Sequence, residues 1–132
     1  METIINFIGH FHPILVHLPI GILLFAIVLQ LLSKWEKFDQ LANALPFAYL
    51  LGAISAVFSC ITGLGLANNG DYDADLVFKH QWLGISVAVI SLTGYYLIKK
   101  NKTVYSKWLS YFLLLLIIIT GHLGGTLTHG AG

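Results

Sequence analysis

Histidine is the residue type in this sequence with the greatest capacity for ligand chemistry. The six histidines form three groups at the ends of apolar runs: His10, His12 and His17, then His80, then His122 and His129. A neutral imidazole is a common metal ligand and also binds haem iron axially, while a carbonyl or hydroxyl group orients its second ring nitrogen. The histidines therefore predict a ligand site if folding brings the groups together.

The closing stretch of the chain suggests how such a site could be shaped. His122 and His129 are seven residues apart, so on a helix they lie almost on one face. Gly124 and Gly125 lie between them, and Gly84 follows a histidine by one helical turn. Glycines on membrane helices allow close helix packing, or they leave room for a planar cofactor. The pattern alone is compatible with both.

Composition indicates that the bilayer is the solvent. Apolar residues make up 57% of the chain, charged residues 10%, and the mean hydropathy is +0.81, whereas a soluble domain needs roughly a quarter of its residues charged. The net charge is only +1, and no basic patch of the kind that binds nucleic acid is present. The single cysteine, Cys60, is predicted to be a small buried residue.

Four apolar segments are long enough to cross a membrane. They cover residues 13–32, 46–67, 78–98 and 108–127, each near the ~20 residues that span a bilayer. Backbone groups in lipid must bond internally, so each segment is predicted to be a helix, and short connections make neighbours antiparallel. The predicted fold is all-α: one membrane-spanning up-down four-helix bundle over residues 1–132. Pro19 lies inside the first helix and is expected to free a carbonyl close to His17.

Lysine placement predicts the orientation. Residues 33–45 and 99–107 contain lysines, whereas residues 68–77 are acidic. By the positive-inside rule the lysine-containing connections are cytoplasmic, so both termini and all three histidine groups face outward.

Several function classes are disfavoured. No span has an acidic or basic residue at its centre, as a proton pump or ion-coupled transporter would need. No Ser-His-Asp or paired-carboxylate pattern indicates hydrolysis. These patterns therefore give no indication of a stand-alone enzyme.

Depth in the membrane ranks the histidines. His17 and His122 lie inside their spans, where an unpaired ring costs up to a few kcal/mol, so they are the preferred ligand pair, with His80 as main competitor. His12 is rotated away from His17 by a five-residue step and is as readily a solvated interfacial side chain. Hydrogen bonding without any ligand is the alternative interpretation for every ring.

Three motifs resemble a known family. Residues 12–21 (HPILVHLPIG), 80–84 (HQWLG) and 121–125 (GHLGG), with His129 and Gly130, are similar to the successive motifs of the bacterial four-helix membrane family called domain of unknown function twenty-two thirty-one. In that family the module often precedes an outward-facing cytochrome c or Rieske-type domain, which implies electron transfer in the bacterial inner membrane. This sequence stops at Gly132 without such a domain, as a stand-alone or truncated module would. The resemblance carries over to five histidines: His12, His17, His80, His122 and His129.

The leading hypothesis is a module that binds haem b near the outer face and transfers electrons. Its expected cofactor-binding residues are His17, His122, His80, His129 and His12. Gly84, Gly124 and Gly125 are expected to leave room for the haem. The expected partners are the lipid bilayer and a cytochrome c or other periplasmic redox protein, and the chain is compatible with an oligomer. The alternatives are a copper or zinc site built from His17, His80 and His122, and a structural anchor with hydrogen-bonded histidines.

Overall fold

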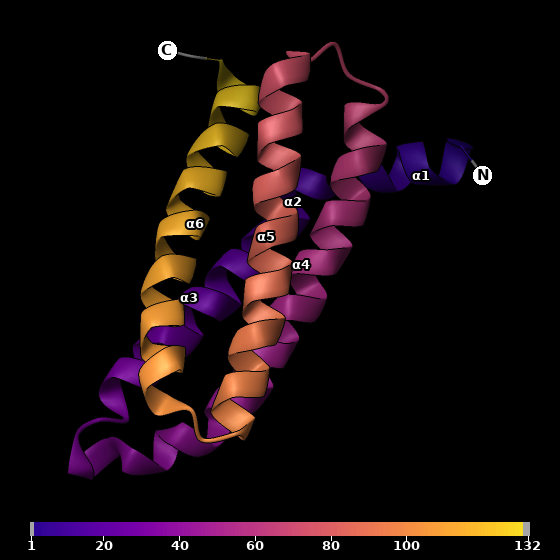
Figure 1. Ribbon diagram of the computed structural model, residues 1–132. Coiled ribbons are helices and arrows are strands. Elements are labelled where there is room, and N and C mark those ends of the chain that lie inside the picture. Colours follow the sequence, from indigo (N-terminus) through magenta and orange to yellow (C-terminus); the bar gives the residue numbers. More distant parts are fainter. Residues whose placement is uncertain (1, 131–132) are drawn as a thin grey trace.

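The computed structural model describes residues 2–130, and all regular structure in that range is helical. The elements in chain order are α1 (Glu2–Gly9), α2 (His12–Leu15), α3 (His17–Leu32), the 3-10 segment η1 (Glu36–Ala44), α4 (Leu45–Ala67), α5 (Ala74–Lys99) and α6 (Thr103–His129). Four stretches are long and apolar enough to cross a membrane: His12–Leu32, Glu36–Ala67, Ala74–Lys99 and Thr103–His129. The predicted all-α membrane bundle is confirmed, and each predicted span lies inside one of these stretches (Figure 1).

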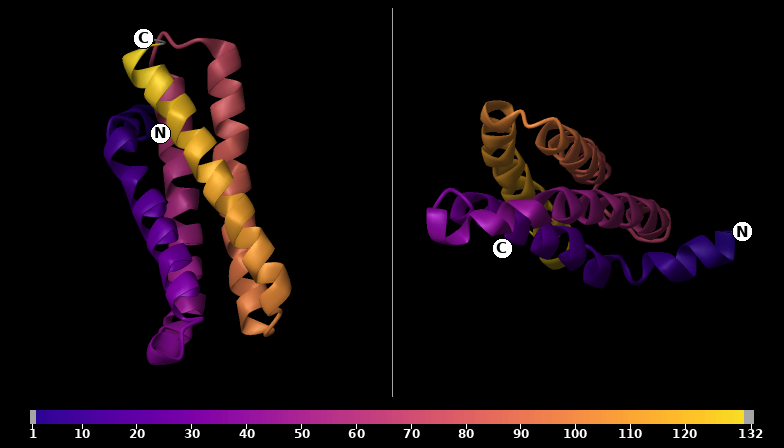
Figure 2. Two further views of the ribbon diagram at one scale, coloured as in Figure 1. Left: turned by 90° about the vertical axis from the view of Figure 1, so that its left-hand side faces the viewer. Right: turned by 90° about the horizontal axis from the view of Figure 1, so that it is seen from below.

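Consecutive long helices pack side by side, whereas α3 and α6 meet only over a short length (Figure 2). Small residues permit the close approach. A Cβ on Gly52 would overlap the side chain of Leu23, and a Cβ on Gly94 would lie 2.8 Å from the Tyr49 ring. Tyr49 and Leu23 are fully buried, so these glycines make room for the largest side chains of the core.

A buried polar cluster joins three helices near the end of the bundle that carries the two lysine-containing connections. The Tyr49 hydroxyl on α4 donates to Gln30 Oε1 on α3 at 2.7 Å, and Gln30 Nε2 donates to Ser106 Oγ on α6 at 3.3 Å. All three side chains are buried. Because an apolar surrounding strengthens hydrogen bonds and penalises unpaired groups, this cluster fixes the register of the three helices.

Pro19 frees the carbonyl that the sequence predicts. It lies in the first turn of α3 and has no N–H to donate to Leu15, four residues earlier. The Leu15 carbonyl instead accepts a hydrogen bond of 3.3 Å from Ser59 Oγ on α4. The chain turns at Val16, which separates α2 from α3, and α2 packs against α4.

Helix α1 lies outside the predicted spans. It runs across the bundle instead of along it (Figures 1 and 2) and packs on α4. Glycines allow the crossing, since a Cβ on Gly9 would lie 2.6 Å from the Leu66 nitrogen and a Cβ on Gly65 would overlap the Ile5 carbonyl. The sequence signal for a separate helix is ambiguous because this short apolar segment leads directly into the first span.

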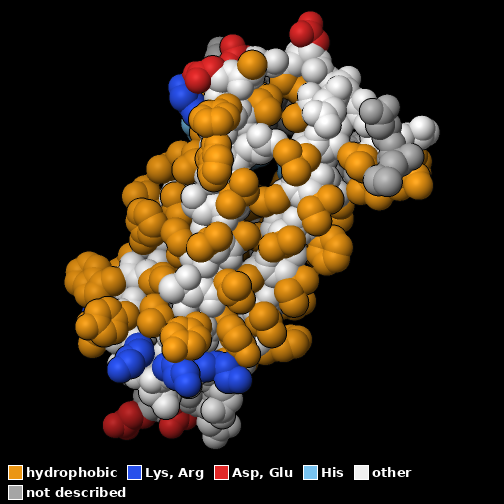
Figure 3. All heavy atoms as spheres, turned by 45° about the vertical axis from the view of Figure 1, so that its right-hand side comes forward, with side chains coloured by type: hydrophobic (Ala, Val, Ile, Leu, Met, Phe, Trp, Pro, Cys, Tyr) orange, Lys and Arg blue, Asp and Glu red, His pale blue; other side chains and the backbone are white. Residues whose placement is uncertain are grey.

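The surface matches a membrane protein. Figure 3 shows apolar side chains over the middle of the visible face, a band of lysines below them and acidic side chains near both ends. Large apolar residues point outward along every span, among them Phe25, Phe58 and Ile118, each at least 60% exposed. Bilayer lipid is the environment that this surface requires.

The buried polar cluster yields a test of the packing. Replacing Tyr49 by Phe leaves Gln30 Oε1 without its donor and should lower the free energy of unfolding by about 1–3 kcal/mol. Tyr111→Phe, at a 40% exposed tyrosine, is the matched control and should have no measurable effect. Unfolding in mixed micelles, followed by circular dichroism, measures both. Equal stability of the two variants would contradict the assigned role of the cluster.

Candidate cofactor-binding cavity

A cavity of about 480 Å³ lies at the end of the bundle that carries the acidic connection. Its volume is in the range of small-molecule and cofactor sites. The walls come from α2, α3, α4, α5 and α6 and are mostly apolar, with Val16, Ile20, Val87 and Ile117 among them. Four histidines also line it: His12, His17, His80 and His129.

His12 begins α2 and is half-buried in this cavity. Its Nδ1 lies 3.1 Å from Thr62 Oγ1 on α4. The Thr62 hydroxyl donates its only hydrogen to the Ser59 carbonyl at 3.0 Å, so its oxygen accepts the bond from the ring. This arrangement assigns the proton to Nδ1 and leaves a lone pair on Nε2.

His80 on α5 is held in the same way by a different group. Its Nδ1 lies 3.1 Å from the Thr120 carbonyl on α6, which can only accept. The proton is therefore on Nδ1, and Nε2 again keeps its lone pair. This is the tautomer in which a histidine ligates a metal while its second nitrogen is oriented by the protein.

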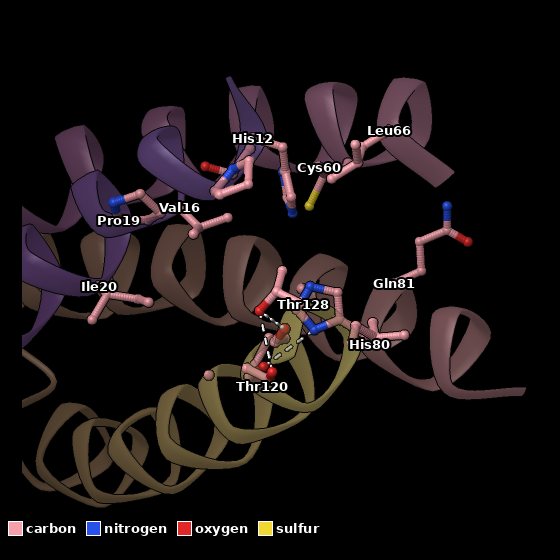
Figure 4. Close-up of a pocket in the computed structure, with 18 of the residues that line it drawn as sticks. His12, Val16, Pro19, Ile20, Cys60, Leu66, His80, Gln81, Thr120 and Thr128 are labelled. Carbon is pink, nitrogen blue, oxygen red and sulfur yellow. Dashed lines mark hydrogen bonds between the residues drawn. The ribbon is translucent and has the colours of Figure 1, made fainter. Parts of the chain in front are cut away.

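The two rings point toward one another across the cavity (Figure 4). Their centroids are 6.2 Å apart and their planes make an angle of 83°. An ion about 2 Å from each of two opposed imidazole nitrogens needs ring centroids roughly 6 Å apart. The separation of the His12 and His80 rings is therefore compatible with two imidazoles that bind one ion.

Glycines on neighbouring helices leave space for these two rings. A Cβ on Gly63 would lie 2.9 Å from Cε1 of His12, and a Cβ on Gly124 would lie 3.0 Å from Cε1 of His80. Gly125 also lines the cavity but has no neighbour within 4 Å of its Cβ position, and Gly84 faces Cys60 Sγ at 3.6 Å. The two glycines expected to leave space for a cofactor therefore differ. Gly124 accommodates a histidine ring, whereas Gly125 borders open space in the cavity.

The two histidines expected to be most buried, His17 and His122, are not buried. His17 and His122 are both exposed, and His122 is not part of the cavity lining. Two residues on a helix turn it by about 200°, so with Gly124 against α5, His122 faces the opposite side of α6. The five-residue step from His12 turns His17 by about 140° away from α4.

The remaining histidine contacts are local. His17 Nδ1 donates to the Pro13 carbonyl at 2.7 Å, and His17 lies at the edge of the cavity. His10 is exposed and donates to the Asn6 carbonyl at 2.9 Å, outside the cavity lining. His129 is exposed and lines the cavity at the last turn of α6.

A three-histidine metal site is not assembled. Among residues 2–130, no group of three or more His, Cys, Asp or Glu side chains is close enough to hold an ion. His17, His80 and His122, expected to form such a set, point in different directions for the rotational reasons above. The structure brings together two histidines, His12 and His80.

Comparison with known proteins places the chain in a family. The model of a family described as predicted membrane protein (DUF2231) matches residues 10–132. The chain belongs to the DUF2231 family. No curated protein and no solved structure matches it. The matched region of this DUF2231 chain contains both paired histidines and the groups that orient them, and it begins just after α1.

Sequence reasoning missed the groups that orient the rings in this DUF2231 chain. Thr62 follows Ser59 by three residues and shares its helix face, so a signal for it was present. The Thr120 partner is a backbone carbonyl, which no side-chain pattern reveals.

Thr62 provides a test of the assigned tautomer. Thr62→Val removes the acceptor of His12 Nδ1–H, so the proton should shift largely to Nε2, whereas Thr62→Ser should keep it on Nδ1. Nitrogen-15 NMR of ring-labelled protein distinguishes the two tautomers by the shift of each ring nitrogen. An unchanged His12 spectrum in Thr62→Val would show that this hydroxyl does not set the tautomer.

Proposed function

We propose that this membrane protein binds haem b and transfers electrons, with His12 and His80 as the axial ligands. One observation carries the proposal: two imidazoles from different helices face each other at 6.2 Å across a cavity. Both rings are hydrogen-bonded through Nδ1 and present Nε2. Paired axial histidines of this kind suit a haem that cycles between two iron oxidation states.

The cavity fits the group in two further respects. A porphyrin supplies four nitrogen donors itself, so two protein ligands complete the iron, which agrees with a pair of histidines. The apolar walls suit a flat macrocycle, and Gly125 leaves one wall without a side chain. When bound, haem supplies one-electron chemistry, while the chain holds it, orients its ligands and limits access of water.

A bare copper or zinc ion is the second candidate. Two imidazoles would bind it, but zinc sites take at least three protein ligands, and the described residues 2–130 offer no such group. Elemental analysis separates the cases, since stoichiometric copper or zinc without porphyrin would favour the bare ion. If the histidines had a purely structural role, the Nε2 lone pairs of both rings would bind no ligand in the cavity.

Orientation and partners follow from charge. We propose that the chain lies in the bacterial inner membrane with both termini and the cavity on the outer side, and the lysine band at the opposite end supports this orientation. Asp71, Asp73 and Asp75 lie in the connection and first turn next to the cavity end. An acidic surface there would steer a basic soluble redox protein, such as a cytochrome c, toward the site.

The absorption spectrum tests the ligand assignment. Full-length protein expressed with ample haem supply should show a Soret band and, after reduction, α and β bands. His12→Ala and His80→Ala should each abolish this spectrum, and His122→Ala and His10→Ala should preserve it. A colourless wild-type protein would refute haem binding. Loss of the bands only in His17→Ala and His122→Ala would assign the other pair.

A glycine that contacts a histidine ring gives a second, steric test. Gly124→Val places its side chain against the His80 ring and should lower haem occupancy about tenfold or more, because a displaced ligand costs on the order of 1.4 kcal/mol or above. Gly21→Val adds the same bulk outside the cavity lining, where no atom lies within 4 Å of the Cβ position, and should leave the occupancy unchanged. Haem per protein, from the pyridine haemochrome assay, is the readout. An equal loss in both variants would contradict the assigned role of Gly124.

A further inference from the structure

A second cavity, widely open to the surface and lined mainly by exposed side chains, lies at the opposite end of the bundle, where α5 turns into α6. Its volume is about 570 Å³, and Tyr96, Leu97, Lys100, Lys102 and Tyr105 line it. None of these residues contributes to the histidine cavity. The lining combines two ammonium groups, two phenolic hydroxyls and one aliphatic side chain.

The turn that carries the two lysines has a defined backbone. Lys102 N–H donates to the Leu97 carbonyl at 2.9 Å, and Asn101 N–H donates to the Ile98 carbonyl at 3.0 Å. Asn101 has φ of 54°, the left-handed conformation of a Schellman motif. Lys100 and Lys102 therefore project from a fixed turn, and Lys100 Nζ lies 5.8 Å from the centroid of the Tyr96 ring.

Positive charge at this cavity is not neutralised by the protein. In the part of the chain that the structure describes, the ion pair present is Lys79–Asp75, at the other end of the bundle. Residues 99–107 contain four lysines and no acidic residue. An anion would thus meet ammonium groups that form no ion pair with the described part of the chain, and such groups attract an anionic membrane surface.

The surroundings are apolar on the side that faces the membrane. Val104, Tyr105 and Trp108 begin α6 and are 64%, 67% and 67% exposed. The cavity therefore lies between the apolar belt and the lysine band seen in Figure 3. A ligand that has both a negative headgroup and acyl chains would use both surfaces, whereas a free anion would use only the lysines.

We propose that this cavity binds the phosphate of an anionic phospholipid. Lys100 and Lys102 donate to the phosphate oxygens, the hydroxyls of Tyr96 and Tyr105 provide further donors, and the acyl chains lie along Leu97 and the start of α6. Inorganic phosphate shares the headgroup chemistry but lacks the chains, so it serves as the competing source in the test. This site is independent of the proposed haem function.

Native mass spectrometry of the full-length protein in neutral detergent can count bound lipids. With phosphatidylglycerol added, the wild type should retain one tightly bound lipid, and phosphatidylcholine should not replace it. The double variant Lys100→Gln/Lys102→Gln should lower phosphatidylglycerol affinity about tenfold or more, from the loss of two lysine contacts. Lys34→Gln/Lys37→Gln removes the same charge in the other lysine-containing connection and should leave that affinity unchanged.

Three outcomes would overturn the proposal. Equal loss in both double variants would indicate general charge attraction in place of a site. Displacement of phosphatidylglycerol by millimolar inorganic phosphate would show that the anion alone is the ligand. Retention of the lipid by the Lys100→Gln/Lys102→Gln variant, with its helicity confirmed by circular dichroism, would exclude these lysines from any lipid site.

Discussion

An unpaired backbone carbonyl inside a bilayer must find a donor, and the one that Pro19 frees finds Ser59. That hydrogen bond of 3.3 Å joins the end of α2 to α4. The same stretch of α4 carries Thr62, which orients His12, and Gly63, which leaves room for its ring. Pro19 therefore helps to fix His12 against α4, because the carbonyl that it frees bonds to the same part of α4 that contacts the His12 ring.

The bundle differs at its two ends. Toward the lysine band, Tyr49, Gln30 and Ser106 form a buried cluster that joins three helices. Toward the acidic connection, a cavity of about 480 Å³ separates the same helices. Hydrogen bonds between buried side chains thus hold α3, α4 and α6 together in one half of the bundle, whereas the other half leaves space between these helices.

The hydrogen bonds of His12 and His80 determine which ring nitrogen of each is available to a ligand. A buried neutral imidazole can satisfy itself with one donor and one acceptor, which would leave nothing for a ligand. In this protein a threonine hydroxyl and a backbone carbonyl each accept from Nδ1, so both rings present the same nitrogen to the cavity. Two unrelated partners that produce one tautomer give the pair its resemblance to oriented metal ligands.

The amino-acid sequence was sufficient to predict the helical class, the four spans, the carbonyl freed by Pro19 and the presence of histidines at three span ends. These properties depend on composition and on periodicity within one helix, which are local. Which histidines meet was settled by the packing of the helices. His17 and His122 lie further inside their predicted spans than the other histidines. The rotation of each helix about its axis nevertheless turns both side chains outward and brings His12 close to His80. Helix rotation depends on side chains from several segments at once, such as Gly124 against His80, and no single stretch of sequence contains that information.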